Sequence, residues 1–228
     1  MNKLKIILLQ MCLVIVSSNT YAALGLDSSR YIYNSDQESI SGIISNNASQ
    51  DYGAQVWVES DIENDTNAPK FIATPSFFQI KRKGKQVFRL MAVNDAITHK
   101  VNNEQLYWLN IQEIPPKMNG NGLAFAIRNR VKLIYRPEAL TENRYKAERE
   151  IKLVKEGGET YLVNPTPYIF AISTIENQDG ESISFNQSKQ DELSVFRPGA
   201  RVKVSSKSRK IFTINDDGNI ESYILNND

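Results

Sequence analysis

Arg30 and Lys132 are the two side chains whose type and setting point most directly to binding chemistry. Arg30 lies in the run LGLDSSRYIY, where one face of an expected strand carries Leu24, Leu26, Ser28, Arg30 and Ile32. A guanidinium among apolar neighbours favours bidentate contact with a carboxylate or phosphate, which predicts an anion site. The alternative is an arginine at a strand edge, with its stem packed and its head in water. Lys132 raises the same question, since alone it would be a solvated lysine on a polar face.

Residues suited to covalent or metal chemistry are scarce. The chain has one cysteine, Cys12, and one histidine, His99, which lies in a polar stretch expected to form a loop. No nucleophile-elbow motif accompanies His99, and a single histidine does not suffice for a His-rich metal site. Paired carboxylates meet only in space, so the sequence leaves them open without pointing to them. We expect no enzymatic activity, no metal and no cofactor.

One segment, residues 122–137 (GLAFAIRNRVKLIYRP), alternates for longer than a strand normally does. The apolar positions on one parity are Leu123, Phe125, Ile127, Val131, Leu133 and Tyr135, interrupted only by Asn129. Arg128, Arg130 and Lys132 occupy the other parity. Successive side chains of a strand point to opposite faces, so this pattern predicts a strand with one apolar and one partly basic face. Most strands run about five or six residues, so the surplus length needs an explanation.

Residues 1–22 have the layout of a secretory signal peptide. Lys3 and Lys5 precede an apolar run, and small and polar residues follow before Ala23, where cleavage is expected. Gln10 interrupts the apolar run, which is short for a bilayer span, so membrane insertion is not expected. Cys12 would leave with this segment. The exported chain must then be held together by packing alone, without disulfides.

Charge and composition restrict the classes of partner. The formal net charge of the 228 residues is +1, and removal of Lys3 and Lys5 leaves it close to neutral. A near-neutral chain offers no general attraction to nucleic acid or to a membrane surface. Any basic site must therefore be local.

The remaining chain reads as short strands in two groups. In the first group we expect strands at 26–33, 39–45, 54–59, 77–80, 86–92, 106–112 and 123–135, which is the pattern of an antiparallel sandwich. In the second group we expect them at 151–154, 160–163, 168–174, 182–185, 200–204, 211–214 and 220–224. The sequence thus predicts a first domain over 23–138, a polar linker over 139–150 and a smaller β domain over 151–228.

The motifs together resemble periplasmic pilus-assembly chaperones of the chaperone–usher pathway. The match begins with the end of the long strand, Val131-Lys132-Leu133-Ile134-Tyr135-Arg136-Pro137. Further matches follow in the family's order: Ser29-Arg30-Tyr31-Ile32, Ile44-Ser45-Asn46, Trp57-Val58-Glu59, Ile72-Ala73-Thr74-Pro75, Leu106-Tyr107-Trp108-Leu109-Asn110, Asn164-Pro165-Thr166-Pro167-Tyr168 and Ile214-Asn215-Asp216. They span almost the whole chain after residue 22. Each motif is weak alone, and the combination is specific.

The resemblance implies an all-β fold of two immunoglobulin-like sandwiches set at an angle, like a boomerang with a cleft. It also implies a periplasmic chaperone that binds pilus subunits by donor-strand complementation and delivers them to an outer-membrane usher. Leu123, Phe125 and Ile127 would insert into the groove of an incomplete subunit. Arg30 and Lys132 would bind the subunit's C-terminal carboxylate.

The resemblance further assigns Glu104, Arg136 and Asp216 to an ionic network between the domains. Three unrelated surface charges are the alternative, because only proximity in space distinguishes the two cases. The chain has Ser76 where many family members have a second proline. The short segment 117–122 and the lack of a cysteine pair are typical of the short-loop subclass.

Other partners remain open from the sequence. A secreted two-domain adhesion or carbohydrate-binding module is the rival hypothesis, with the basic strand face binding anionic glycans. A second copy of the chain is a candidate cover for the apolar row in the free protein, because an exposed row of this kind promotes association.

Overall fold

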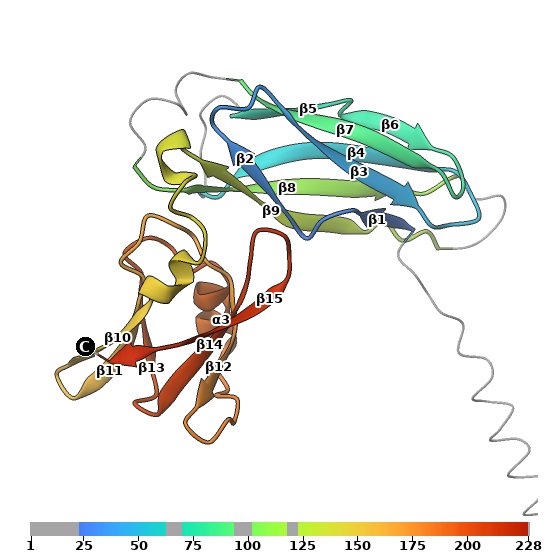
Figure 1. The fold of residues 1–228 in the computed structure, drawn as a ribbon. Helices are drawn as coiled ribbons and strands as arrows, with labels where there is room; N and C mark the ends of the chain where they lie inside the picture. The colour runs from blue at the N-terminus through green and yellow to red at the C-terminus, as the bar shows by residue number, and fades with distance from the viewer. Residues whose placement is uncertain (1–22, 63–69, 94–101, 118–122, 228) are drawn as a thin grey trace, which may run out of the picture.

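The computed structural model describes residues 23–62, 70–93, 102–117 and 123–227. The expected signal peptide 1–22, with Cys12, lies outside these residues, as do His99 and most of the 117–122 segment. The described chain folds into two β-sandwiches set at an angle (Figure 1), and the all-β prediction is confirmed.

Two sheets packed face to face form the first sandwich. One sheet has the strand order β1–β3–β7–β5: β1 (Leu24–Leu26), β3 (Ile40–Asn46), β7 (Lys85–Ala92) and β5 (Phe71–Thr74). The other has the order β2–β9–β8–β4–β6: β2 (Arg30–Asn34), β9 (Arg128–Arg136), β8 (Gln105–Ile114), β4 (Tyr52–Ser60) and β6 (Phe77–Ile80). Alternate residues point into the core between them, as Ala54 and Val56 do on β4.

The second sandwich is smaller. One sheet has the order β13–β11–β10–β16: β13 (Arg201–Val204), β11 (Glu159–Val163), β10 (Lys152–Glu156) and β16 (Asn226–Asn227). The other has the order β12–β14–β15: β12 (Ile172–Asn177), β14 (Ser208–Ile214) and β15 (Ile220–Ile224). The helical elements are η1 (Glu138–Leu140), η2 (Ala147–Glu150) and α3 (Gln187–Ser194).

The expected first strand, 26–33, is wrong as one element. It divides into β1 and β2, which belong to different sheets. Asp27 stabilises the turn between them, because its carboxylate accepts hydrogen bonds from Tyr31 Oη at 2.6 Å and from the Ile43 amide at 3.0 Å. Leu24 and Arg30 therefore do not share one strand face. Arg30 instead opens β2.

The long strand also differs from the prediction. β9 begins at Arg128, and of residues 123–127 only Ile127 has a backbone hydrogen bond to β8 within the described chain, from the Glu113 amide to its carbonyl. Continuing the β8–β9 register, in which Gln112 lies opposite Arg128, would bring Phe125 opposite Pro115 and Ala124 opposite Pro116. Proline has no amide hydrogen to donate, so the ladder ends where β8 runs into the two prolines.

Some elements escaped the sequence pattern. β5 was not expected, and α3 is a polar helix in which only Leu193 is buried. The Asn186 side chain caps α3 by accepting from the Lys189 amide at 3.0 Å. The expected strand 182–185 is reduced to one bridge, Glu176 to Ser182. The strand expected at 168–174 begins later, at Ile172, as β12.

The segment expected as a linker, 139–150, is partly packed. Ala147 belongs to the core of the second sandwich, and Arg144 and Glu148 are buried. A smaller apolar cluster joins the two sandwiches, with Leu106 and Ile134 from the first and Ile169 and Val195 from the second. The predicted domain boundaries stay a prediction, but the two sandwiches have separate cores and a packed junction.

We expect Gly42→Ala to lower the free energy of unfolding by about 1–3 kcal/mol, because the core cannot accept an added methyl group without shifting. A Cβ at Gly42, on β3, would lie 2.4 Å from Phe88 Cζ and 2.7 Å from Tyr31 Oη. Urea denaturation measures the loss. Gly25→Ala is the control, because its Cβ would meet only the Asn47 side-chain amide at 3.3 Å. Equal stability of the two variants would contradict this packing argument.

Candidate functional site

Arg30 and Lys132 lie side by side at the junction of the two sandwiches. β2 runs parallel to β9, and the register pairs Arg30 with Lys132. This pairing is long-range and parallel, so the alternation of the two strands cannot reveal it. Arg30 is 7% exposed, so the interpretation as a strand-edge arginine with its head in water is wrong.

Both cations contact the second sandwich through backbone carbonyls. Arg30 Nη1 donates to the Ile214 carbonyl at 2.8 Å, and Lys132 Nζ donates to the Ser194 carbonyl. Arg30 Nε is buried and has no hydrogen-bond partner within the described chain. Neutral carbonyls do not cancel a positive charge, and neither cation forms an ion pair within the described residues, so the pair there is an unneutralised cationic site.

The electrostatics fit a site prepared for an anion. Desolvation and the neighbouring Arg30 guanidinium lower the pKa of Lys132 to about 8. Burial likewise lowers the pKa of Arg30, against a smaller opposing effect of Asp216. A carboxylate placed between the two groups would raise the pKa of Lys132 again and give the guanidinium a bidentate acceptor. The pair can therefore bind a carboxylate.

The second part of the site is an apolar row, which we define as Leu123, Phe125 and Ile127. These side chains are 84%, 77% and 44% exposed. The row leads directly into β9 and towards Lys132. β2 pairs with β9 only from Lys132 onward, so among the described residues the β9 edge over Arg128–Val131 has no neighbour on that side. An exposed apolar row with an open strand edge is the geometry of strand addition.

Glu104, Arg136 and Asp216 lie together beyond the cation pair. Arg136 Nε donates to Glu104 Oε1 at 2.6 Å, and Arg136 Nη2 lies 2.8 Å from Asp216 Oδ2. Glu104 Oε2 accepts from the Ile169 amide at 2.7 Å. Burial raises the pKa of Glu104 despite the opposing guanidinium of Arg136. These contacts join the two sandwiches, and the role of the three residues in holding the interdomain angle stays a prediction.

Sequence reasoning missed Arg144, which extends this group of charges. Arg144 Nη2 lies 2.9 Å from Glu148 Oε1 and 3.2 Å from Asp216 Oδ1. Its guanidinium carbon lies 5.2 Å from the ring centre of Phe170. The one signal in the sequence was the spacing of Arg144 and Glu148, four residues apart in a polar segment. That spacing is common on solvated surfaces and does not indicate burial.

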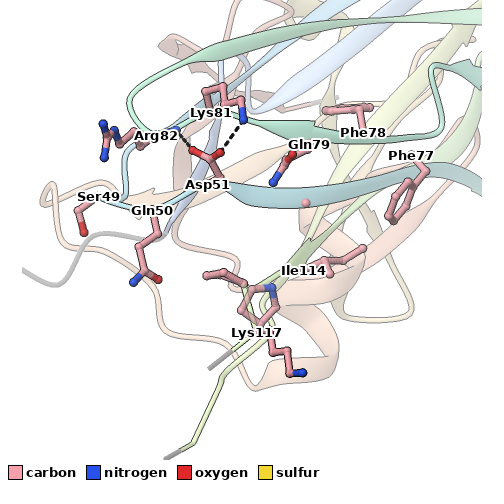
Figure 2. A pocket seen from close by; sticks show the side chains of 13 residues that line it. Ser49, Gln50, Asp51, Phe77, Phe78, Gln79, Lys81, Arg82, Ile114 and Lys117 are labelled. Atoms are coloured by element: carbon pink, nitrogen blue, oxygen red, sulfur yellow. Dashed lines mark hydrogen bonds and ion pairs between the residues drawn. The ribbon is translucent and has the colours of Figure 1, made fainter. Parts of the chain in front are cut away.

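A separate hollow of about 990 Å³ opens on the first sandwich. Lys81 Nζ donates to Asp51 Oδ2 at 2.9 Å, and the Arg82 amide donates to Asp51 Oδ1 at 2.8 Å. Figure 2 shows these residues, with Phe77 and Ile114, among those that line the hollow. Neither Arg30 nor Lys132 lines it. The hollow is therefore distinct from the cation pair.

Metal and membrane sites find no support in the parts described. In residues 23–62, 70–93, 102–117 and 123–227, no three His, Cys, Asp and Glu side chains gather closely enough to hold a metal. The same residues contain no helix with the length and apolar character needed to cross a membrane.

Known proteins resemble the chain in sequence and in fold. Residues 23–141 match the family described as pili and flagellar-assembly chaperone, PapD N-terminal domain. Chaperone protein FaeE of Escherichia coli is 37% identical over 95% of this chain and 83% of FaeE. Chaperone protein FanE of Escherichia coli is 40% identical over 93% of this chain and 94% of FanE. The crystal structure of the YadV chaperone has a TM-score of 0.69 and 27% identity, covering 90% of this chain and all of YadV.

The lowered pKa of Lys132 predicts a pH dependence of stability. Between the folded value of about 8 and the ordinary value of 10.5, the unfolded chain binds the proton more strongly than the folded chain. Raising the pH through this window therefore favours folding. We compare the free energy of unfolding of the wild-type protein with that of Lys132→Met. The wild-type value minus the variant value should rise with pH by at most roughly 1.4 kcal/mol per pH unit.

Urea denaturation of both proteins at intervals across this window measures the gain. Lys155→Met, at an exposed lysine on β10, is the control and should differ from the wild type by a constant amount. A constant difference for Lys132→Met as well would contradict the burial of an unneutralised charge.

Proposed function

Because this chain belongs to the family of pili and flagellar-assembly chaperones, we propose that it captures pilus subunits in the periplasm by lending them its apolar row. The subunits then pass to an outer-membrane usher. The observation that carries the proposal is that Leu123, Phe125 and Ile127 stand exposed beyond the end of their own sheet. The proposed activity is non-catalytic, because binding alone completes the subunit.

The strand order supports one orientation for the captured segment. β2 occupies the β9 edge from Lys132 onward and runs parallel to β9. A subunit strand that pairs with the free edge of β9, before Lys132, would lie in line with β2. It must end at Arg30, because β2 begins there. If that strand also runs parallel to β9, its C-terminal carboxylate arrives at Arg30 and Lys132. The two parts of the site then serve one ligand.

The two parts contribute differently to binding. Burial of three large apolar side chains stabilises a complex by roughly 1.5–3 kcal/mol each as an upper bound. The carboxylate fixes the register, which matters because a slip of one residue would turn the apolar row away from the groove. The row therefore supplies most of the affinity, and the cation pair selects a chain end.

The charges around Arg136 support a rigid cleft. We propose that Glu104, Arg136 and Asp216, with Arg144, hold the angle between the sandwiches. Their contacts are largely buried and join Glu104, just before β8, and Arg136, at the end of β9, to the second sandwich. This role does not require contact with the subunit.

The rival carbohydrate-binding hypothesis loses its main feature. It needs the basic face of β9 to attract anionic polymers. Arg128 and Arg130 instead share Glu59 and lie over the rings of Trp57 and Trp108. One carboxylate and two indole rings thus hold both guanidiniums against the sheet, and Lys132 on the same face turns to the Ser194 carbonyl, so the three charges do not form an open basic stripe.

Removal of either cation should abolish capture. We expect Arg30→Ala and Lys132→Ala each to weaken the complex by about 2–5 kcal/mol, because the carboxylate would be left without its partner in a desolvated site. The chaperone is co-expressed with small β-rich proteins from neighbouring open reading frames, and co-purification from periplasmic extracts is measured. Lys155→Ala is the control. Wild-type yields of complex from both variants would disprove the anchor assignment.

A charge in the apolar row should also release the subunit. Phe125→Glu would bury an unpaired carboxylate in the subunit groove, so co-purification should fall below detection. Ala126→Glu is the matched control, because Ala126 is exposed and has the opposite parity in the same segment. We expect the control to retain most of the complex. Equal behaviour of the two variants would show that the row does not enter a groove.

A further inference from the structure

Arg128 connects the end of the apolar row to the body of the first sandwich. It is the first residue of β9 and follows Ile127 directly. Its Nε and Nη2 donate to Asn110 Oδ1, on β8, at 2.9 and 2.6 Å. Nη2 also donates to both carboxylate oxygens of Glu59, on β4, at 2.7 and 2.6 Å. One side chain thus ties three neighbouring strands together.

Asn110 and Glu59, the side chains that accept hydrogen bonds from Arg128, are themselves held in place by other contacts. Asn110 is fully buried, and its Nδ2 donates to the Trp108 carbonyl at 3.0 Å. Glu59 accepts from Trp57 Nε1 at 2.9 Å, and the guanidinium carbon lies 4.9 Å from the Trp57 ring centre. Burial alone would raise the pKa of Glu59, but the Trp57 hydrogen bond and the guanidiniums outweigh it and lower the pKa. The carboxylate therefore stays ionised and oriented.

The backbone beside Arg128 is held at the same point. The Ile127 carbonyl accepts from the Glu113 amide at 2.9 Å and from Gln112 Nε2 at 3.3 Å. Upstream of it, residues 123–126 have no backbone hydrogen bond to the rest of the described chain. Among the described residues, the hydrogen bonds that hold this end of the apolar row to the sheet are therefore those of Ile127 and Arg128.

We propose that Arg128, held by Glu59 and Asn110, is a positioning residue for subunit capture. It fixes the direction and register of the apolar row relative to Lys132 before a subunit arrives. Binding then orders fewer degrees of freedom, which is the general benefit of a preorganised segment. This inference rests on the proposed function of the apolar row.

The experiment measures row mobility and capture separately. A nitroxide spin label is attached at Ala126→Cys in the Cys12→Ser protein, where it is the only cysteine. Arg128→Ala should increase the mobility of the label in the free protein and weaken capture of the co-purifying subunit by about three- to ten-fold. The thermal midpoint is measured alongside and both readouts are taken where the variant is fully folded, because Arg128→Ala also removes the donors to the buried Asn110 Oδ1.

Arg130→Ala is the matched control. Arg130 lies on the same face of β9 and stacks 4.3 Å from the Trp108 ring centre, but it reaches Glu59 only at 4.0 Å. We expect wild-type label mobility and capture from this variant. Arg128→Lys should rescue only part of both effects, because an ammonium cannot replace the forked contact.

Each remaining outcome identifies what is wrong. Weaker capture by Arg128→Ala with unchanged label mobility would overturn positioning in favour of direct contact. Unchanged capture would overturn the inference while the proposed function stands. No capture by the wild-type protein would overturn the proposed function, and the inference with it.

Discussion

The structure depends on a backbone hydrogen-bond ladder that stops early. β8 and β9 pair from Gln105 to Gln112, and the chain then reaches Pro115 and Pro116. The last backbone hydrogen bond of the ladder joins the Glu113 amide to the Ile127 carbonyl, and without amide hydrogens on the two prolines β8 does not continue it to the residues before Ile127. The apolar row keeps its alternating pattern but has no sheet of its own to pack against. The lack of two amide hydrogens, at Pro115 and Pro116, therefore leaves the apolar row exposed where the strand would otherwise continue.

The apolar row results from strand pairing that ends early, whereas the cation pair results from strand pairing that forms. The parallel register of β2 and β9 forces Arg30 and Lys132 into adjacent positions. Burial of two like charges opposes folding, and the lowered pKa of Lys132 reflects that cost. The separate cores and the ionic contacts of Arg136 must offset it. An anion bound between the two charges would reduce that cost, which is consistent with a function in ligand capture.

Much of the fold was predictable because buried and exposed residues alternate along the strands. The β6 and β15 boundaries follow directly from the sequence, and β3, β4, β7 and β8 differ by only a residue or two at their ends. The division of β1 from β2 was not predictable, because it depends on hydrogen bonds of the Asp27 side chain. α3 was missed because a polar helix with one buried leucine has no apolar period. The site followed from resemblance, since proximity of Arg30 and Lys132 requires knowledge of a long-range parallel pair.

The second sandwich carries neither the apolar row nor the cations, yet it completes the site. The carbonyls of Ser194 and Ile214 accept from Lys132 and Arg30, and Asp216, two residues after Ile214, pairs with Arg136. The apolar cluster around Leu106, Ile134 and Ile169 lies at the same junction. A shift of the second sandwich would therefore move the carbonyls that orient both cations. The angle between the sandwiches and the orientation of Arg30 and Lys132 therefore change together. Contacts far from the apolar row can thus still determine where a captured strand must end.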